Sequence, residues 1–376
     1  MASIATGLAA RLPQIIDDIE ELIVAESPTA DLAAVAKCAE IVAALGTRLT
    51  GQAPEWLFSA GRPSLRWRFG SADARSKVLL LGHFDTVWPI GSLLTHPFAV
   101  ADGRLTGPGC FDMKAGLVQL FHALSVLDDL DGVTVLATSD EEVGSISSRA
   151  LIEAEARRAG AVLVLEASEW GALKTERKGA SLYDLTIAGR AAHAGLEPQR
   201  GVNATIELAH QVLALADIAD LAVGTTVTPT VATAGTTRNT VPDSALLLVD
   251  VRVETAAEQQ RVDAAMRALT PVLPGAELRL SGGPDRPPLQ ATSSAALFAR
   301  AGRLYGELGF GQLRGVAVGG GSDGNLTAGA GAPTLDGLGA VGGGAHADHE
   351  HVIVAELPRR AALVGELVAE LCKEPA

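Results

Sequence analysis

Between residues 78 and 167, short apolar runs alternate with longer stretches that have helical spacing. Strands buried on both faces read as continuous apolar runs, and this alternation is typical of a parallel sheet with helices on its faces. The apolar runs are VLLL at 78–81, VTVLAT at 133–138 and AVLVLEA at 161–167, and the helical stretches between them are 114–127 and 148–160. Two further helical stretches, 8–27 and 31–49, precede this region. We therefore predict an α/β fold built on a mainly parallel sheet.

Residues 179–287 have a different order of elements. The pattern predicts strand 181–189, helix 202–217, strand 225–235, strand 244–254, helix 255–273 and strand 276–283. This β-α-β-β-α-β order is that of the split ferredoxin-like unit, which is a complete small domain. We expect it as an insertion between a first part, 1–178, and a second part, 288–376, that rejoins the first sheet. Within the second part, the glycine-dense region 319–344 reads as loops.

Charge and cysteine content exclude some classes of protein. The chain has 30 Lys and Arg against 44 Asp and Glu, and this net charge of −14 without a basic patch argues against a nucleic-acid partner. No apolar run is long enough to span a membrane, and the N-terminal segment lacks the pattern of a signal peptide. Three separated cysteines without a CxxC pair suit a reducing compartment, so we expect a cytoplasmic protein with no membrane partner.

Acidic residues and histidines stand where several predicted strands end. The carboxyl ends of parallel strands meet at one edge of a sheet, where functional crevices form. The residues at these positions, with one from the glycine-rich loop GPGCFDMKAG, are His83, Asp85, Asp112, Glu141, Glu142, Glu166 and His346. Imidazole and carboxylate are both zinc ligands, so the sequence predicts a metal site at this edge.

The spacing suggests separate roles for these residues. Asp85 is two residues from His83 in an extended chain, so it can reach the imidazole ring and orient it. Glu141 and Glu142 are adjacent and would point apart in an extended chain, which suits one ligand and one general base. The donors exceed what one catalytic zinc takes, whereas two zinc ions sharing Asp112 would fit better. As an alternative, SDEE at 139–142 could merely cap the following helix.

These residues lie in motifs that match a known family. The motifs are, in order, GHFDTV, GPGCFDMKAG, TSDEEVGS, VLEAS, AAHAGLEPQRGVNA and GAHADHEHV. Together they resemble the M20 metallopeptidases, most closely the glutamate carboxypeptidase (carboxypeptidase G2-like) branch. The resemblance implies a di-zinc catalytic domain, interrupted by a ferredoxin-like lid that also forms a homodimer. Co²⁺ or Mn²⁺ could replace zinc.

The resemblance also implies a role for each residue of the metal site. It assigns His83 and Glu166 to one zinc, Glu142 and His346 to the other, and Asp112 as the bridge. Asp85 would orient His83, and Glu141 would be the general base. His349 and His351 lie close to His346, so that choice of ligand depends on the family spacing.

The lid motifs imply residues on the substrate side. His193 resembles the family histidine that polarises the scissile carbonyl, from the partner subunit. Asn239 and Arg252 match lid positions near the substrate, and Arg286 and Lys174 resemble substrate-side positions of the glutamate branch. Arg252 and Arg286 could instead be ordinary salt-bridge residues.

The expected reaction is hydrolysis of the amide bond of an N-acyl amino acid or peptide, with release of a C-terminal amino acid, by preference glutamate. An N-acyl-amino-acid deacylase or a dipeptidase would use the same residues, so both alternatives stay open. A non-catalytic binding protein would be expected to lack the base or a ligand, and neither is missing from the sequence.

Overall fold

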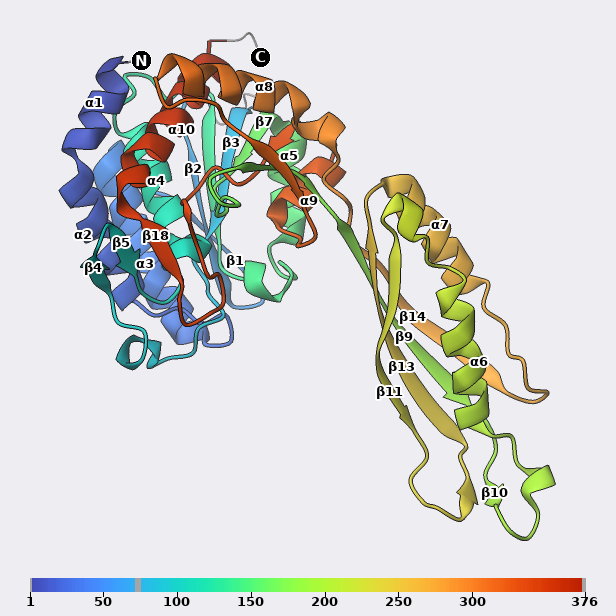
Figure 1. Cartoon of the computed structure of the whole chain (residues 1–376). Helices are drawn as coiled ribbons and strands as arrows, with labels where there is room; N and C mark the ends of the chain where they lie inside the picture. Colours follow the sequence, from blue (N-terminus) through green and yellow to red (C-terminus); the bar gives the residue numbers. More distant parts are fainter. Residues whose placement is uncertain (1, 72–75, 374–376) are drawn as a thin grey trace. The chain divides into compact units, whose positions relative to one another are not determined.

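The structure is a computed structural model that describes residues 2–71 and 76–373 (Figure 1). Its internal contacts divide the chain into two compact units. Unit 1 comprises Met1–Glu176, Gln290–Val318 and Ser322–Ala376, and unit 2 comprises Arg177–Leu289 and Gly319–Gly321. Within the described residues, no helix has the length and apolar character needed to cross a membrane.

Unit 1 is built on a six-stranded sheet with the order β1-β2-β6-β3-β7-β16. The strands are β1 (Glu55–Ser59), β2 (Arg62–Arg68), β3 (Ser76–His83), β6 (Val133–Thr138), β7 (Ala159–Val164) and β16 (Thr334–Leu335). β6, β3, β7 and β16 are parallel, whereas β1 and β2 form an antiparallel hairpin along β6. The predicted α/β class is confirmed, and the antiparallel hairpin is an addition to it.

Helices cover both faces of this sheet (Figure 1). One face packs against α1 (Ala2–Ala10), α2 (Leu12–Val24), α3 (Leu32–Thr50), α4 (Ala115–Leu124), α8 (Ala291–Glu307) and α10 (Leu357–Leu371). The other packs against α5 (Arg149–Arg158) and α9 (Asp323–Gly329). Along β3, Leu80 faces the first group and Leu79 the second, because side chains alternate along a strand. Burial on both faces explains the unbroken apolar runs.

Helix α9 corrects the expectation that residues 319–344 are loops throughout. The Ser322 hydroxyl accepts the main-chain N–H of Gly324 at 3.0 Å, and the Asn325 side chain accepts the N–H of Ser322 at 2.9 Å. This reciprocal capping box satisfies N–H groups at the start of the helix. Leu326 then packs into the core beside α5, so capping and burial outweigh the glycine content.

A small sheet joins two distant segments of unit 1. Its order is β17-β18-β5-β4, formed by β4 (Ala99–Ala101), β5 (Arg104–Thr106), β17 (Gly342–Gly343) and β18 (His351–Ile353). β18 pairs with β5, with His351 opposite Thr106. The segment that carries His346 therefore lies beside the segment that leads to Asp112. A further two-stranded sheet pairs β8 (Leu173–Arg177) with β15 (Gly315–Val318).

Unit 2 is an antiparallel sheet with two helices on one face (Figure 1). Along the chain come β9 (Gly179–Ala188), α6 (Ala204–Ala216), β11 (Thr226–Ala234), β13 (Ser244–Val253), α7 (Ala256–Arg267) and β14 (Glu277–Arg286). The sheet order is β11-β13-β9-β14, and a separate short pair joins β10 (Ala192–His193) to β12 (Thr240–Val241). Helix α7 ends before the expected residue 273, since Pro271 disfavours helical backbone at Thr270.

Candidate metal centre

His83 and Asp85 stand at the carboxyl end of the central strand β3. Both are buried, with 1% and 0% of their surface exposed. The ring Nδ1 of His83 lies 3.0 Å from the main-chain oxygen of Asp85 and 3.4 Å from its carboxylate Oδ1. With Nδ1 directed at Asp85, the other ring nitrogen, Nε2, is left to face the neighbouring carboxylates.

Asp85 also holds the turn that carries the two adjacent glutamates. Its carboxylate accepts the main-chain N–H groups of Glu141 and Glu142, both at 3.2 Å, and the hydroxyl of Thr29 at 2.8 Å. Residues Glu141–Val143 form a single 3-10 turn. The expectation of an extended chain at this point was therefore wrong, because the carboxylate of a neighbouring loop caps a turn there.

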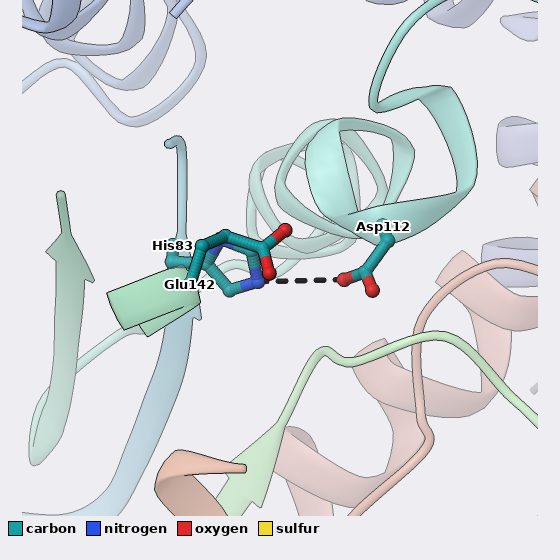
Figure 2. Close-up of side chains that lie close together, drawn as sticks. All are labelled: His83, Asp112 and Glu142. Atoms are coloured by element: carbon teal, nitrogen blue, oxygen red, sulfur yellow. Dashed lines mark ion pairs between the residues drawn. The ribbon is translucent and has the colours of Figure 1, made fainter. Parts of the chain in front are cut away.

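Five side chains converge from separate segments of unit 1. His83 Nε2 lies 3.4 Å from Asp112 Oδ1 and 3.5 Å from Glu166 Oε1. His346 Nε2 lies 3.4 Å from Asp112 Oδ2 and 3.2 Å from Glu142 Oε2. The two oxygens of Asp112 therefore face different histidines, and Figure 2 shows Asp112 opposite His83 and Glu142. Glu141 lies beside them, since its carboxylate is within 4.8 Å of the donor atoms of His83 and Glu166.

The donor set fits divalent metal ions. Among the residues that the structure describes, none forms a hydrogen bond with the buried atoms His83 Nε2 and Glu142 Oε1, a costly state unless another group binds there. Zinc bonds of about 2.0–2.2 Å at tetrahedral angles put neighbouring ligand atoms about 3.3–3.6 Å apart. The observed separations of 3.2–3.5 Å match this spacing and exceed those of ordinary charged hydrogen bonds.

The carboxylates of the cluster also shift the pKa values of its two histidines. Burial disfavours a charged ring at His83, but its contacts with the carboxylates of Asp112, Asp85 and Glu166 outweigh burial and raise the pKa of His83 well above the ordinary value. Contacts with Asp112 and Glu142 raise the pKa of His346 to about 10. The carboxylates thus create a strong preference for positive charge, which metal cations would satisfy.

The loop that carries His346 is a tight turn. Gly344 has φ of 79°, and a Cβ at this position would lie 2.8 Å from the main-chain nitrogen of Glu350. His346 itself has φ of 62°, a conformation that non-glycine residues rarely adopt and that is enriched at functional sites. Among the described contacts, His346 is the histidine of this segment that reaches the carboxylates, while His351 faces the main-chain oxygen of His349.

Other contacts hold the segments around the cluster. The Ser145 hydroxyl donates to the Asp323 carboxylate, which ties the chain after the glutamate turn to helix α9. Glu350 accepts the main-chain N–H of Asp112 at 3.0 Å and the indole N–H of Trp88 at 2.7 Å. Sequence reasoning gave no role to Trp88 or Thr29. The one available signal for Glu350 was its position four residues after His346.

Two of the expected substrate-side residues lie together in unit 2. His193 is in β10, which pairs with β12 so that His193 is opposite Thr240. The main-chain oxygen of Asn239 accepts the N–H of Ala194 at 2.9 Å. His193 Nδ1 accepts the N–H groups of Gly195 and Leu196, both at 3.1 Å. The neutral ring therefore carries its proton on Nε2, which makes Nε2 a hydrogen-bond donor.

The other two expected residues of unit 2 lie at the opposite end of its sheet. Arg252 and Arg286 flank Ala180 on the two strands beside β9. From Ala180, β9 continues for eight residues to its end at Ala188, a length of roughly 26 Å, and β10 follows this far end. Arg252 is held by both oxygens of Asp250, at 2.9 and 2.8 Å. Lys174 belongs to unit 1, where its main-chain N–H donates to Asp336 at 3.0 Å.

A cluster of imidazoles and carboxylates at the carboxyl edge of a mixed α/β sheet is typical of metal-dependent hydrolases. Comparison with known proteins agrees with this. The sequence model of peptidase family M20/M25/M40 matches residues 79–370. The chain is 34% identical to carboxypeptidase G2 of Pseudomonas sp. (strain RS-16) over an alignment of 383 positions, which covers 96% of this chain and 89% of the relative. The chain therefore belongs to peptidase family M20/M25/M40 and is a hydrolase.

Two further relatives have other named activities. Acetylornithine deacetylase of Myxococcus xanthus is 27% identical over 217 residues, which cover 53% of this chain and 56% of that protein. The crystal structure of the aminopeptidase PepT from Bacillus cereus ATCC 10987 superposes with a TM-score of 0.75 at 22% identity, and covers 96% of this chain and 99% of PepT. The latter similarity concerns the fold alone.

Proposed function

We propose that the chain is a di-zinc hydrolase that cleaves the amide bond of N-acyl amino acids or peptides and releases a C-terminal amino acid, by preference glutamate. The observation that carries this proposal is the placement of Asp112, whose two oxygens lie 3.4 Å from His83 and 3.4 Å from His346. A carboxylate with an imidazole at each oxygen suits a bridge between two metal ions. The overall identity to carboxypeptidase G2 supports the reaction class.

The residues that would hold the metals are those predicted from the sequence. His83 and Glu166 would bind one ion, Glu142 and His346 the other, and Asp112 both, with Co²⁺ or Mn²⁺ as alternatives to Zn²⁺. When bound, such ions polarise a scissile carbonyl and make water a stronger acid. Asp85 would keep the His83 ring in place through the contact at Nδ1.

Glu141 is the proposed general base. Its carboxylate approaches the donor atoms of His83 and Glu166, while its main-chain N–H is held by Asp85. From this position Glu141 would take a proton from the attacking water and pass it to the nitrogen of the leaving amine.

His193 is proposed to stabilise the oxyanion with its Nε2–H, from the second subunit of a homodimer. Arg252 and Arg286 flank Ala180, whereas His193 follows the other end of β9, roughly 26 Å further along the strand at Ala188. This supports the arrangement, because one small substrate cannot contact both ends. We infer that residues 179–287 form a ferredoxin-like lid and dimerisation domain, and that residues 1–178 and 288–376 form the catalytic domain. Exposed leucines in unit 2, such as Leu196 and Leu213 at 79% and 70% exposure, support an interface there.

The proposal also assigns residues that would bind the substrate. Arg252, Arg286 or Lys174 would bind the C-terminal carboxylate, and Asn239 would lie near the substrate beside His193. The 27% identity to an acetylornithine deacetylase supports N-acyl-amino-acid deacylation as the second candidate, with dipeptide hydrolysis as a third. The cytoplasmic location stays a prediction from the cysteine pattern.

The test is amino-acid release by the zinc-reconstituted protein from N-acyl amino acids and dipeptides that differ in the C-terminal residue. Preference for glutamate supports the proposal. Preference for neutral residues would support the deacylase or dipeptidase alternative. If the zinc-loaded protein releases no amino acid from any substrate, the proposed hydrolase function is contradicted.

A further inference from the structure

We propose that Glu350 is a positioning residue that fixes the Asp112 carboxylate between His83 and His346, and so sets the affinity of the metal centre. Glu350 touches neither histidine in the described contacts, and it acts through the main chain of the Asp112 loop. The inference rests on the proposed function, because it assumes that Asp112 binds metal.

The contacts of Glu350 are concentrated on one loop. Its side chain is fully buried, with 0% exposed. Oε1 accepts the main-chain N–H of Phe111 at 2.9 Å and that of Asp112 at 3.0 Å. Oε2 accepts the main-chain N–H of Gly109 at 2.9 Å and the indole N–H of Trp88 at 2.7 Å. Both oxygens are therefore occupied by donors, so Glu350 is not itself a metal ligand.

Regular main-chain bonding covers only part of this loop. The turn Cys110–Lys114 has non-helical backbone at Asp112 and Met113. The N–H of Lys114 bonds to the oxygen of Gly109 at 3.0 Å, whereas the N–H groups of Phe111 and Asp112 bond to Glu350. Gly109 has φ of 71°, and a Cβ there would lie 2.4 Å from the Thr86 side chain. A carboxylate that receives several N–H groups substitutes for the missing regular bonding, and charged acceptors form the stronger hydrogen bonds.

Glu350 also connects the two halves of the metal site. It closes the turn that begins at Gly344 and carries His346, with its N–H bonded to the oxygen of Ala347 at 2.9 Å. Its side chain bonds to residues 238 to 241 positions earlier in the sequence. One residue thus bonds both to the main chain of Asp112 and to the turn that carries His346, whose Nε2 lies 3.4 Å from Asp112 Oδ2.

Trp88 extends this support. Its ring stacks on His96 with centroids 5.1 Å apart, and His96 Nε2 accepts the main-chain N–H of Gly107 at 3.2 Å. The loop is therefore held at several successive main-chain groups by buried side chains from segments outside it. Such outer contacts typically tune metal affinity or activity by about 10- to 100-fold.

The test uses Glu350→Gln, which keeps the size of the side chain but places an amide N–H₂ against N–H donors. Zinc affinity, measured by competition with a chromophoric chelator, should fall by about 10- to 100-fold relative to the wild type. The matched control is Glu155→Gln, a buried carboxylate of unit 1 that binds Arg66 at 2.7 Å and Arg68 at 2.6 Å. This control should lower thermal stability and leave zinc affinity unchanged.

A double-mutant cycle separates positioning from a general loss of stability. In an Asp112→Asn background, Glu350→Gln should cause little further loss of zinc affinity, because its effect passes through Asp112. Equal losses in both backgrounds, or zinc affinity unchanged by Glu350→Gln, would overturn the inference. Should Glu350→Gln fail to fold, Glu350→Asp provides the same comparison, because it keeps the charge but cannot reach all four donors.

The wild-type titration distinguishes failure of this inference from failure of the proposed function. Wild-type protein that binds no zinc overturns both. Wild-type protein that binds zinc, with Glu350→Gln binding it equally well, overturns the role of Glu350 alone and leaves the proposed hydrolase intact.

Discussion

The carboxylate of Asp85 accepts the main-chain N–H of Glu141 at 3.2 Å. The same carboxylate lies 3.4 Å from the ring Nδ1 of His83, which also contacts the main-chain oxygen of Asp85 at 3.0 Å. Asp85 therefore links a proposed metal ligand to the proposed base, and a change at Asp85 should disturb both.

For Asp85→Asn, we expect a loss of about 10- to 100-fold in both zinc affinity and kcat/KM, because the amide removes the negative charge beside His83 and turns an N–H₂ group toward the N–H of Glu141 or Glu142. Thr29→Val is the control, since it removes a neutral donor at 2.8 Å from the same carboxylate and should cost less. Chelator competition and steady-state kinetics measure the two effects. If the Asp85→Asn protein had the zinc affinity and kcat/KM of the wild type, Asp85 would not link the metal ligand to the base.

Glu141→Ala should lower kcat by about 10²- to 10⁴-fold while leaving the metal content unchanged, because the proposed base is separate from the ligands. Metal analysis and kinetics on the same preparation test this. Glu153→Ala serves as the control, since Glu153 lies on α5 in an ion pair with Arg157. Full activity in the Glu141 variant, or loss of its metal, would contradict the assignment.

His193→Ala should lower kcat without changing zinc affinity, because His193 contributes a donor and no ligand. The role across subunits can be tested by mixing His193→Ala with Glu141→Ala protein under conditions that exchange subunits. Hybrid dimers should restore about a quarter of wild-type activity, since half of the dimers are hybrids and one site in each is intact. Absence of recovery, despite verified exchange, would place His193 in its own subunit's site or outside the reaction.

Removal of metal with a chelator should abolish turnover and lower the thermal midpoint of unfolding. Bound ions stabilise the folded state, and their removal leaves several carboxylates and the buried His83 nitrogen uncompensated. Addition of Zn²⁺, Co²⁺ or Mn²⁺ should restore both properties. A protein that keeps full activity after verified metal removal would exclude the proposed chemistry.

Asp18 offers a test of stability away from the metal centre. Burial alone would raise the pKa of Asp18, but hydrogen bonds from His122 at 2.7 Å and Arg48 at 2.5 Å outweigh it and lower the pKa. A lowered folded-state pKa means that the stabilisation is present above the pKa of the unfolded chain and is lost as pH falls through the folded value. Asp18→Asn should therefore cost about 1–3 kcal/mol of unfolding free energy near neutral pH.

Urea unfolding at a series of pH values measures this effect. The difference between wild type and Asp18→Asn should narrow in acid, because the wild-type residue is then protonated as well. A difference that stays constant across the series would show that the charge of Asp18 is not its source.

Much of unit 1 was predictable because its strands are buried on both faces. Continuous apolar runs such as VLLL at 78–81 leave little alternative to a central parallel strand, and parallel strands bring their carboxyl ends to one edge. His83 and Glu166 could therefore be grouped from sequence order alone. The family resemblance was confirmed by the comparisons, while the metal-binding role of each residue stays a prediction.

The missed features depend on contacts between distant segments. No local pattern shows that Asp85 caps the turn at Glu141, 56 residues away, and this contact replaced the expected extended chain. The glycine content around α9 predicted loops, whereas the Ser322 cap and the burial of Leu326 stabilise a helix there. Glu350 was assigned no role from the sequence, and its proposed role depends on groups 238 to 241 residues away.

The most direct test of the central claim is the zinc stoichiometry of the purified protein, measured by elemental analysis for the wild type and for Asp112→Ala. A site with a shared carboxylate requires about two zinc ions per chain in the wild type and a clear loss of zinc in Asp112→Ala. One zinc or none in the wild type, or an unchanged content in Asp112→Ala, would contradict a di-zinc centre bridged by Asp112.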